Sequence, residues 1–358
     1  MARLPAEWEP QRGVLLTWPH AGTDWAPCLD AVEALYQRLA ALIAQQEPVL
    51  IVCHDQQHRR HVAARLHQAG VAATARHLAL APSNDTWARD HGPITVIGDD
   101  TGPTLLDFRF NGWGGKFTAD LDDQISGRLH AAGWFGDAAF AASPLVLEGG
   151  AIDSDGRGTV LAVRRTLVDP ARNPGWSEAQ IEAELRARLG AERVLWLSHG
   201  QLSGDDTDGH VDTLVRFCDA GTLCYVQSPG AQDPDHAELT AMEQELIALR
   251  QPDGAPYRLV PLPKPGPLQD TDGQPLPGTY ANFLIINGAV LVPVYDDPAD
   301  ELALARLGPL FPGRRIIPVD CRTLIRQGGS LHCITMQLPA ALPLVDPARA
   351  TPPPAASH

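Results

Sequence analysis

The sequence predicts an α/β fold made of repeated units, and two observations support this prediction. Segments with helical periodicity alternate with short runs of β-branched or apolar residues, which is typical of α/β or α+β proteins. Small polar clusters also recur at intervals of roughly 50 to 70 residues, and a strand-like run follows or overlaps each one. Five such units closing on themselves would bring five polar clusters to one central axis, so we expect the active site there.

Apolar residues at helical spacing predict the helices, and short apolar runs predict the strands. Asp55 is a predicted N-cap, and Ser177 with Gln180 forms a capping-box pattern in a helix that stops at Gly190. The predicted helices cover residues 28–46, 55–70, 177–190, 235–250 and 298–307. The predicted strands cover residues 49–53, 94–97, 160–163, 211–217, 283–286 and 289–293.

We expect residues 1–345 to form a single domain of five pseudo-repeats, followed by a flexible Pro/Ala-rich tail at 346–358. Residues 253–278 are rich in Pro and Gly and predict a long loop of the kind that often covers an active site. The alternative fold is a doubly wound sheet in which the cluster spacing is coincidental. The chain has no G-x-G-x-x-G or G-x-x-x-x-G-K-[ST] pattern, so neither dinucleotide nor P-loop binding is supported.

Composition narrows the class of protein. The chain has 358 residues, no secretory signal and no apolar stretch of the length that spans a bilayer, so we expect a soluble cytoplasmic protein. Its six cysteines form no Cys-x-x-Cys pair and are read as free thiols. A formal net charge of −15 disfavours nucleic acid and membranes as partners and attracts cations, although acidity also serves solubility alone. The sequence leaves a homo-oligomer open.

The cluster with the clearest chemical potential is Gly-Gly-Ser-Leu-His-Cys, which ends at Cys333. Its glycines allow a tight turn, and the strand-like alternation after it places the cysteine at a loop-to-strand boundary, exposed enough to react. Taken alone, a cysteine is more often a small buried hydrophobe than a nucleophile. His210 and Asp212 lie two apart, which in a strand puts both side chains on one face. They have three readings: a core pair, part of a metal site, or an oriented acid/base beside a substrate-binding acid.

Two further acids and two tryptophans belong to the other clusters. Asp90 lies between turn signals and has a structural reading as the partner of Arg89, whereas Glu148 ends an apolar run before two glycines. A buried acid in that position needs a partner, and a bound cation would serve. Trp87 and Trp113 are ordinary core or lid residues, but an aromatic face over a planar cation is also favourable.

Together these residues suit chemistry on a guanidinium group. Carboxylates can hold its nitrogens bidentately, a thiolate can attack its carbon, and an imidazole can protonate the departing ammonia and then deprotonate water. That scheme requires neither metal nor cofactor, and the chain offers no His-x-His or HExxH motif.

At these residues the sequence resembles the agmatine deiminase and bacterial-type peptidyl-arginine deiminase family, within the guanidino-group-modifying enzymes. The resemblance runs from residue 5 to residue 339. It rests on WARDHGP at 87–93, FNGWGGKF at 110–117, LEGGAID at 147–153, GHVDT at 209–213, YANFLIIN at 280–287 and GGSLHC at 328–333.

The resemblance implies a five-bladed α/β propeller, the pseudo-fivefold pentein fold, in agreement with the cluster spacing. It implies that Cys333 forms a covalent thiouronium and that His210 is general acid and base. By the same resemblance Asp90 and Asp212 grip the guanidinium, Glu148 assists beside His210, and Trp87 and Asn282 line the pocket. The family usually has Gly-Gly-Gly-Asn before the aliphatic residue, His and Cys, whereas residues 328–331 here read Gly-Gly-Ser-Leu.

The predicted reaction is therefore hydrolysis of a small guanidino compound. Agmatine, giving N-carbamoylputrescine and ammonia in polyamine biosynthesis, is the leading substrate, and peptidyl or free arginine or another alkylguanidine is the alternative. Two other classes remain as rivals. One is a metallohydrolase that uses His210, Asp212 and Asp90, and the other is a scaffold that binds cations without catalysis.

Overall fold

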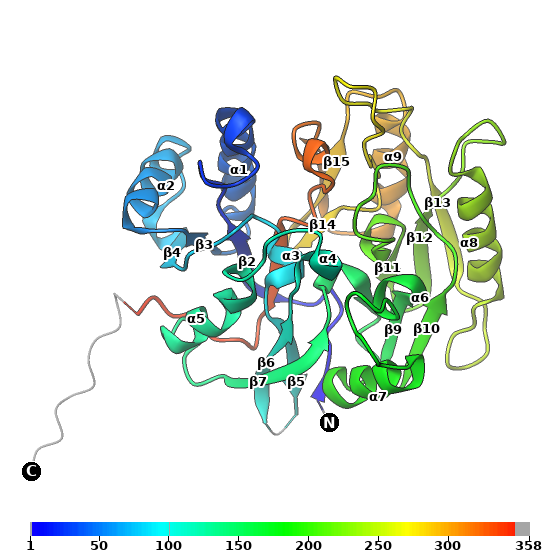
Figure 1. The fold of residues 1–358 in the computed structure, drawn as a ribbon, viewed down its shortest axis with the longest axis horizontal. Coiled ribbons are helices and arrows are strands. Elements are labelled where there is room, and N and C mark those ends of the chain that lie inside the picture. Colours follow the sequence, from blue (N-terminus) through cyan, green and yellow to red (C-terminus); the bar gives the residue numbers. More distant parts are fainter. Residues whose placement is uncertain (1, 100, 348–358) are drawn as a thin grey trace, which may run out of the picture.

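A computed structural model describes residues 2–99 and 101–347 and has a mixed α/β fold, as the sequence predicts (Figure 1). Its described strands form five small sheets. The first contains β1 (Ala2–Arg3), β5 (Ile94–Gly98), β6 (Gly102–Arg109) and β7 (Ala139–Val146), and the second contains β8 (Ile152–Ser154), β9 (Thr159–Val163) and β10 (Arg193–Leu197). The third contains β11 (Val215–Asp219), β12 (Thr222–Val226) and β13 (Arg258–Leu262), and the fourth β14 (Leu284–Ile286), β15 (Ala289–Val294) and β16 (Arg315–Asp320). The fifth joins the two ends of the fold: β17 (Thr335–Pro339), β2 (Gln11–Thr17), β3 (Val49–Cys53) and β4 (Arg76–Leu80).

All five sheets repeat one pattern, an antiparallel pair followed by a parallel pair. Helices occupy the connections between parallel strands. Neighbouring parallel strands start at the same end of the sheet, so the chain must cross back to that end between them. These helices are α1 (Leu29–Ile43), α2 (Gln56–Gln68), α5 (Ile125–Ala131), α6 (Arg164–Leu167), α7 (Glu178–Leu189), α8 (His236–Ala248) and α9 (Asp300–Leu307). In Figure 1 the longer helices lie at the periphery, and the short α3 (Ala88–His91) and α4 (Gly112–Gly115) lie near the middle.

The predicted helix ends are confirmed where a cap fixes them. The Asp55 carboxylate accepts a hydrogen bond from the His58 backbone N–H at 2.8 Å, so α2 begins at the next residue. Ser177 and Gln180 form the reciprocal capping box of α7. Gly190 follows α7 with a φ of 66°, the left-handed conformation that glycine adopts readily.

Strands β2 and β3 are buried on both faces. Along β2, Val14 and Leu16 pack into one apolar cluster, while Leu15 packs into a second cluster on the other side. The same alternation occurs along β3, because successive strand residues point to opposite faces. Strands that are packed on both faces are held rigidly, and they support the turns that lead into them.

Two predicted elements are wrong in part. Residues 211–217 are not one strand: Val211–Thr213 is a 3₁₀ turn, and β11 starts after it. His210 and Asp212 therefore share a turn, where main-chain torsions rather than strand alternation set their directions. The predicted loop at 253–278 contains β13, because residues 258–262 pair in parallel register with β12.

The single-domain prediction for residues 1–345 stays a prediction. Of the predicted tail at 346–358, residues 348–358 lie outside the described residues. Within the part of the chain that is described, no helix combines the length and apolar character needed to cross a membrane.

Candidate active site

The predicted site residues lie on turns that precede the first strand of a sheet's antiparallel pair. Asp90 belongs to α3 before β5, Glu148 precedes the turn Gly149–Ala151 before β8, and His210 and Asp212 flank the turn before β11. Asn282 precedes β14 and Cys333 precedes β17. The turn before β8 contacts both α3 and the turn before β11, and α3 also contacts β17. The repeated topology thus collects side chains that are distant in sequence.

Gly150 shows how tightly these side chains converge. A Cβ atom on this glycine would lie 2.6 Å from His210 Nδ1, 2.9 Å from Asp90 Oδ1 and 3.1 Å from Asp212 Oδ2. An imidazole and two carboxylates therefore surround one point, and a residue with a side chain would fill it. The second glycine of the Leu-Glu-Gly-Gly cluster is required here by close approach.

The His210 ring is fully buried between two acids. Its Nδ1 lies 3.7 Å from Asp90 Oδ1 and its Nε2 lies 3.9 Å from Glu148 Oε2. Neither ring nitrogen has a hydrogen-bond partner among the described residues, although the ring has no access to bulk solvent. Such an orphaned polar group is costly unless a ligand or water completes it.

Both carboxylate oxygens of Asp90 are held by hydrogen-bond donors. Its Oδ2 accepts a hydrogen bond from Trp113 Nε1 at 3.0 Å, and its Oδ1 accepts one from the Gly150 N–H at 3.1 Å. Burial raises the pKa of Asp90 to about 6, with the charges of Asp212 and Glu148 adding to the rise. The structural reading of Asp90 as the partner of Arg89 is wrong, because Arg89 bonds Glu7 and Gln337 instead.

Glu148 has a protein cation as its partner. Arg172 Nε donates to Glu148 Oε1 at 2.8 Å, and both side chains are fully buried. Arg172 also bonds Asp169 and Asp208. The second oxygen, Glu148 Oε2, has no hydrogen-bond partner among the described residues and is the atom that faces His210.

Asp212 is bonded to a residue that sequence reasoning did not select. His332 Nδ1 lies 2.7 Å from Asp212 Oδ2, and His332 Nε2 lies 2.8 Å from Glu7 Oε1. Glu7 is in turn paired with the buried Arg216 and with Arg89. Burial alone would raise the pKa of Asp212, but the hydrogen bond and charge of His332, with smaller effects from His210 and Arg216, lower it.

His332 and Glu7 both lie in segments that carried the family resemblance, so a signal for them existed. His332 directly precedes the cysteine, and Glu7 lies in the Pro-Ala-Glu-Trp-Glu-Pro segment at 5–10. What the sequence lacked was any sign that these two residues, 325 positions apart, are in contact.

Cys333 is more buried than predicted, with 3% of its surface exposed. Its Sγ lies 3.4 Å from Asn282 Oδ1 and 3.9 Å from Asp212 Oδ2. Burial raises the pKa of the Cys333 thiol well above its ordinary value, and the nearby carboxylates of Asp212 and Asp90 raise it further. In the free protein this environment favours the neutral thiol over the thiolate.

A pocket leads from the surface to Cys333. Trp87, Asp90, Trp113 and Gly329 line it, whereas Asn282 contacts the thiol from behind and is not part of the lining. The lining carries the carboxylates of Asp24, Asp85, Asp90, Asp206 and Asp270, and one cation, Arg326, within the described part of the chain.

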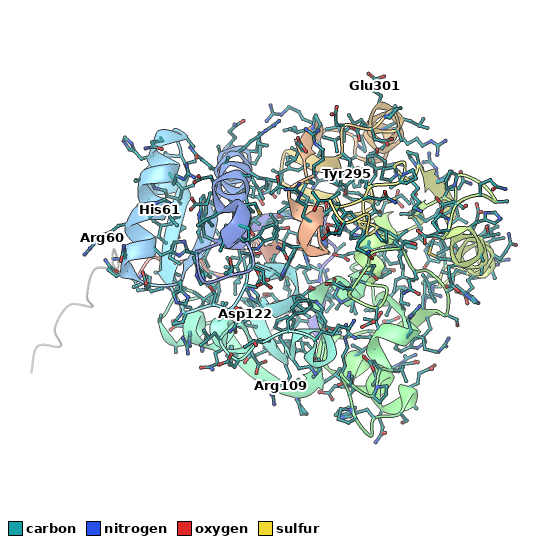
Figure 2. The ribbon with its side chains drawn as sticks, turned by 45° about the horizontal axis from the view of Figure 1, so that its top comes forward. Arg60, His61, Arg109, Asp122, Tyr295 and Glu301 are labelled. Carbon is teal, nitrogen blue, oxygen red and sulfur yellow. The ribbon has the colours of Figure 1, made fainter. Side chains whose placement is uncertain are left out.

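Polar contacts behind the pocket fix its walls. Asp122, labelled in Figure 2, accepts hydrogen bonds from the backbone N–H groups of Asn84 and Asp85, which hold the turn before Trp87. Tyr295, also labelled in Figure 2, bonds Ser330 Oγ at 3.0 Å. Ser330, where this chain departs from the family pattern, is therefore turned into the core and does not line the pocket.

Metal ligation is not suggested by the arrangement of the described side chains. Within residues 2–99 and 101–347, no three His, Cys, Asp or Glu side chains are grouped so that they could hold a metal ion.

Comparison with known proteins shows the family of this chain. Residues 3–339 match the model of the Porphyromonas-type peptidyl-arginine deiminase family. The chain belongs to this family. It is 33% identical to the agmatine deiminase of Stutzerimonas stutzeri, over 94% of this chain and 95% of that protein. The family is one of hydrolases that act on carbon–nitrogen bonds, and this deiminase is therefore an enzyme of that class.

Solved structures agree with the family. A Campylobacter jejuni agmatine deiminase variant with substrate bound superimposes with a TM-score of 0.86 at 32% identity, covering 94% of this deiminase and 96% of that chain. A Porphyromonas gingivalis protein provisionally named an arginine deiminase gives a TM-score of 0.87 at 49% identity, covering 96% and 99% of the two chains.

The buried Glu148–Arg172 pair generates a stability prediction. We expect Arg172→Met to lower the free energy of unfolding by about 3–5 kcal/mol, because removing the cation leaves a buried carboxylate uncompensated. Urea denaturation at pH 7 measures the change. The matched control is Arg322→Met, which breaks a half-exposed pair and should cost about 1 kcal/mol or less. Equal losses of unfolding free energy in the two variants would contradict the role of Arg172 as the cation that compensates the buried Glu148 carboxylate.

Proposed function

We propose that this deiminase hydrolyses the guanidinium group of agmatine to N-carbamoylputrescine and ammonia through Cys333 and His210. One observation carries the proposal. Four buried polar atoms in this site have no hydrogen-bond partner among the described residues: both ring nitrogens of His210, Glu148 Oε2 and Asp212 Oδ1. Asp212 Oδ1 requires a donor, which a planar guanidinium can supply, and Glu148 Oε2 faces His210, whose imidazolium form can supply another. The imidazole is then left as the group that exchanges protons.

Binding would begin with the carboxylates. Asp90 and Asp212 lie on either side of the point defined by Gly150, so they can hold a guanidinium by its nitrogens over the thiol of Cys333. Trp113 fixes Asp90 from behind and also lines the pocket with Trp87. Charge-assisted hydrogen bonds in a site without bulk water are strong and orienting.

The bound cation would also activate the nucleophile. In the free protein, burial and the nearby negative charges raise the pKa of the Cys333 thiol. A positive charge beside the sulfur offsets these effects and lowers that pKa. The thiol proton passes to His210, which lies with Asp90 and Asp212 around the point defined by Gly150. The resulting thiolate then attacks the guanidinium carbon.

His210 would manage the two proton transfers that follow. In the first half-reaction it gives a proton to the departing nitrogen, the C–N bond breaks, ammonia leaves and a thiouronium remains on Cys333. In the second it takes a proton from water, the oxygen bonds to the same carbon, and the C–S bond breaks. His210 returns its proton to the thiolate of Cys333, and the ureido product loses the remaining hydroxyl proton to solvent. Glu148, 3.9 Å from the ring, stabilises the imidazolium form.

The charge of the pocket supports agmatine over arginine. Beyond the guanidinium site, the lining adds the carboxylates of Asp24, Asp206 and Asp270, which attract the terminal ammonium of agmatine. These acids would repel the α-carboxylate of free arginine. The alternative keeps one specific support, since Arg326 also lines the pocket and the related Porphyromonas gingivalis protein bears the arginine deiminase name.

The repeated sheets support one further proposal. We propose that the five sheets are the blades of a five-bladed propeller, because they repeat one strand order and their leading turns meet at the site. The cytoplasmic location, the absence of a cofactor and the absence of nucleic acid or membrane partners stay predictions from the sequence.

The direct test is ammonia release from a panel of guanidino compounds. We expect agmatine to give the highest kcat/KM, and Cys333→Ser and His210→Ala each to lose on the order of 10³-fold or more in kcat, since nucleophile and base act as a unit. Cys28→Ser, a partly exposed thiol remote from the pocket, is the matched control. Turnover in Cys333→Ser at the wild-type rate would end the proposal. A higher kcat/KM for arginine than for agmatine would overturn only the choice of agmatine as the substrate.

A second prediction concerns His332. An asparagine places its amide nitrogen where His332 Nδ1 lies and so keeps the contact with Asp212, whereas a glutamine reaches the Nε2 position and keeps the contact with Glu7 instead. Losing the Asp212 contact raises the pKa of that carboxylate, so the decline of kcat/KM at acidic pH moves to higher pH.

We therefore expect His332→Gln to move the acidic limb of the kcat/KM profile upward by about one pH unit, and His332→Asn to leave it near the wild-type position. The measurement is the pH profile of agmatine turnover in the three proteins. Equal displacement in both variants would show that Asp212 does not depend on this hydrogen bond.

A further inference from the structure

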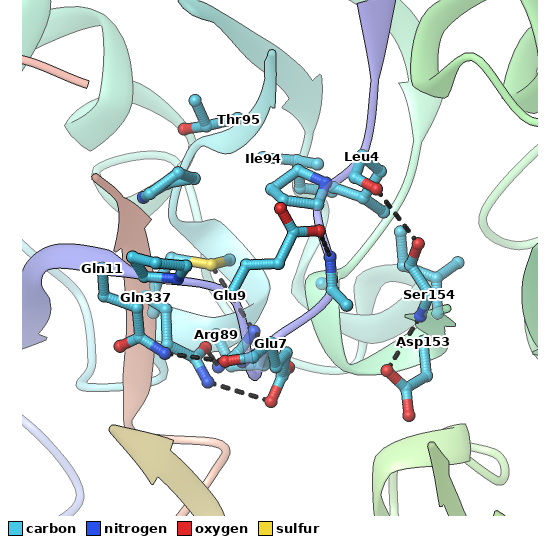
Figure 3. A pocket seen from close by; sticks show the side chains of 17 residues that line it. Leu4, Glu7, Glu9, Gln11, Arg89, Ile94, Thr95, Asp153, Ser154 and Gln337 are labelled. Atoms are coloured by element: carbon cyan, nitrogen blue, oxygen red, sulfur yellow. Dashed lines mark hydrogen bonds and ion pairs between the residues drawn. The ribbon is translucent and has the colours of Figure 1, made fainter. Parts of the chain in front are cut away.

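His210 is supported differently from the two carboxylates that share its site. Both oxygens of Asp90 accept hydrogen bonds, and Asp212 is bonded to His332, which is itself bonded to Glu7. Figure 3 shows Glu7 held by further hydrogen bonds. Neither ring nitrogen of His210 has such a partner among the described residues. The direction of its ring is therefore set by packing and by the main chain of the turn that carries it.

The turn before His210 has an unusual backbone. Asp208 has a φ of 67° and Gly209 a φ of 88°, so two successive residues adopt the left-handed conformation. Within the described part of the chain, the other non-glycine residues with a positive φ are Trp113 and Asp296. A side chain makes this conformation unfavourable, and it persists only where surrounding contacts hold it. Asp208 must therefore be held in place.

Contacts hold both the side chain and the main chain of Asp208. Its Oδ2 accepts hydrogen bonds from Lys116 Nζ at 2.7 Å and from Arg172 Nη1 at 2.8 Å, and its carbonyl oxygen accepts one from Thr166 Oγ1 at 2.9 Å. Burial raises the pKa of the Asp208 carboxyl, but the hydrogen bonds of Lys116 and Arg172 lower it below its ordinary value. The carboxylate therefore stays ionised at neutral pH as the partner of two cations.

Arg172 connects Asp208 with the acid beside the imidazole. Its Nε donates to Glu148 Oε1 at 2.8 Å, and the other oxygen of Glu148 lies 3.9 Å from His210 Nε2. One buried guanidinium thus holds both the turn that carries His210 and the carboxylate that faces its ring. A change at Asp208 therefore alters the position of the ring relative to this acid.

Lys116 connects Asp208 with the segment that supports Asp90. It belongs to the same segment, residues 110–117, as Trp113, which is left-handed with a φ of 56° and donates a hydrogen bond to Asp90. Lys116 Nζ also donates to the carbonyl oxygen of Asp206 at 2.6 Å. Lys116 therefore links two segments that each contain a left-handed residue and that each support a group of the active site.

We propose that Asp208 is a positioning residue for the catalytic histidine. Its carboxylate, bonded to Lys116 and Arg172, keeps the main chain before His210 in the left-handed conformation, and this conformation directs the imidazole to the point where it exchanges protons. Asp208 itself is not among the described residues that line the pocket to Cys333. This role rests on the proposed function, because the direction of the ring matters only if His210 transfers protons.

The test compares three substitutions of Asp208 in the full-length enzyme. Lys116 and Arg172 bond the same oxygen, so the side-chain oxygen of an asparagine can accept from both, and asparagine also tolerates the left-handed conformation. Asp208→Gly loses both contacts but adopts that conformation freely. Asp208→Ala loses the contacts and also disfavours the conformation.

We expect Asp208→Asn to keep kcat for agmatine within about threefold of wild type, and Asp208→Ala to lose about tenfold more kcat than Asp208→Gly. KM should stay within about threefold in all three variants, because the hydrogen bonds that hold Asp90 and Asp212 do not involve Asp208. The matched control is Asp296, which has a φ of 62° and an exposed ion pair with Arg322. Asp296→Gly and Asp296→Ala should have equal kcat.

A second comparison uses a lysine that is partly exposed, so that its loss leaves the protein folded. We expect Lys116→Met to lower kcat about fivefold in wild type and clearly less in the Asp208→Gly background, where no carboxylate remains for the lysine. Equal losses in the two backgrounds would overturn the proposal. Equal kcat in folded Asp208→Gly and Asp208→Ala would overturn it as well, because Asp208 would then only anchor the two cations.

A readout without substrate separates failure of this role from failure of the proposed function. The ring nitrogen NMR signals of His210 are identified by their absence in His210→Ala. They should keep their wild-type positions in Asp208→Gly and move in Asp208→Ala. Identical positions in these two variants would overturn the positioning role, whether or not agmatine is the substrate.

Discussion

The structure depends on one electrostatic constraint: two carboxylates and an imidazole are buried around a single point, and a third carboxylate, that of Glu148, faces the other nitrogen of the imidazole. Each acid is satisfied from the outside, Glu148 by Arg172, Asp212 by His332, and Asp90 by the N–H groups of Trp113 and Gly150. Both ring nitrogens of His210, Glu148 Oε2 and Asp212 Oδ1 nevertheless lack partners among the described residues. Burying such groups costs free energy unless a ligand completes them, so the site is complementary to a planar cation rather than to itself.

The fold meets this constraint with short turns on rigid supports. Each turn that brings an acid, the imidazole or the thiol enters a strand packed on both faces, so small displacements are resisted by close-packed cores. Pairing β17 with β2 brings the C-terminal cysteine segment next to the N-terminal segment that carries Glu7. The ends of the chain are therefore parts of the active-site support, which explains why the family match extends over residues 3–339.

Much of this arrangement follows from local sequence. The caps at Asp55 and Ser177, the strands near residues 49, 94 and 289, and the recurrence of polar clusters all reflect short-range chemistry, and the structure has them. The turn at 211–213 was misread as strand because Val-Asp-Thr has strand-like composition, while its conformation is set by contacts with distant turns. Arg172 and His332 were missed for a related reason: their partners Glu148 and Glu7 are far away in sequence, and only the folded chain joins them.

The most direct measurement of the central claim is the pKa of the Cys333 thiol with and without a bound cation. The ultraviolet absorbance of the thiolate can be titrated in wild type against Cys333→Ser, in the absence and presence of saturating methylguanidine. The account predicts a pKa well above that of an ordinary cysteine in the free protein, and a fall of about one unit or more when the guanidinium occupies the carboxylates. An unchanged thiol pKa in the presence of bound methylguanidine would contradict it, because the cation would then lie elsewhere than beside the sulfur.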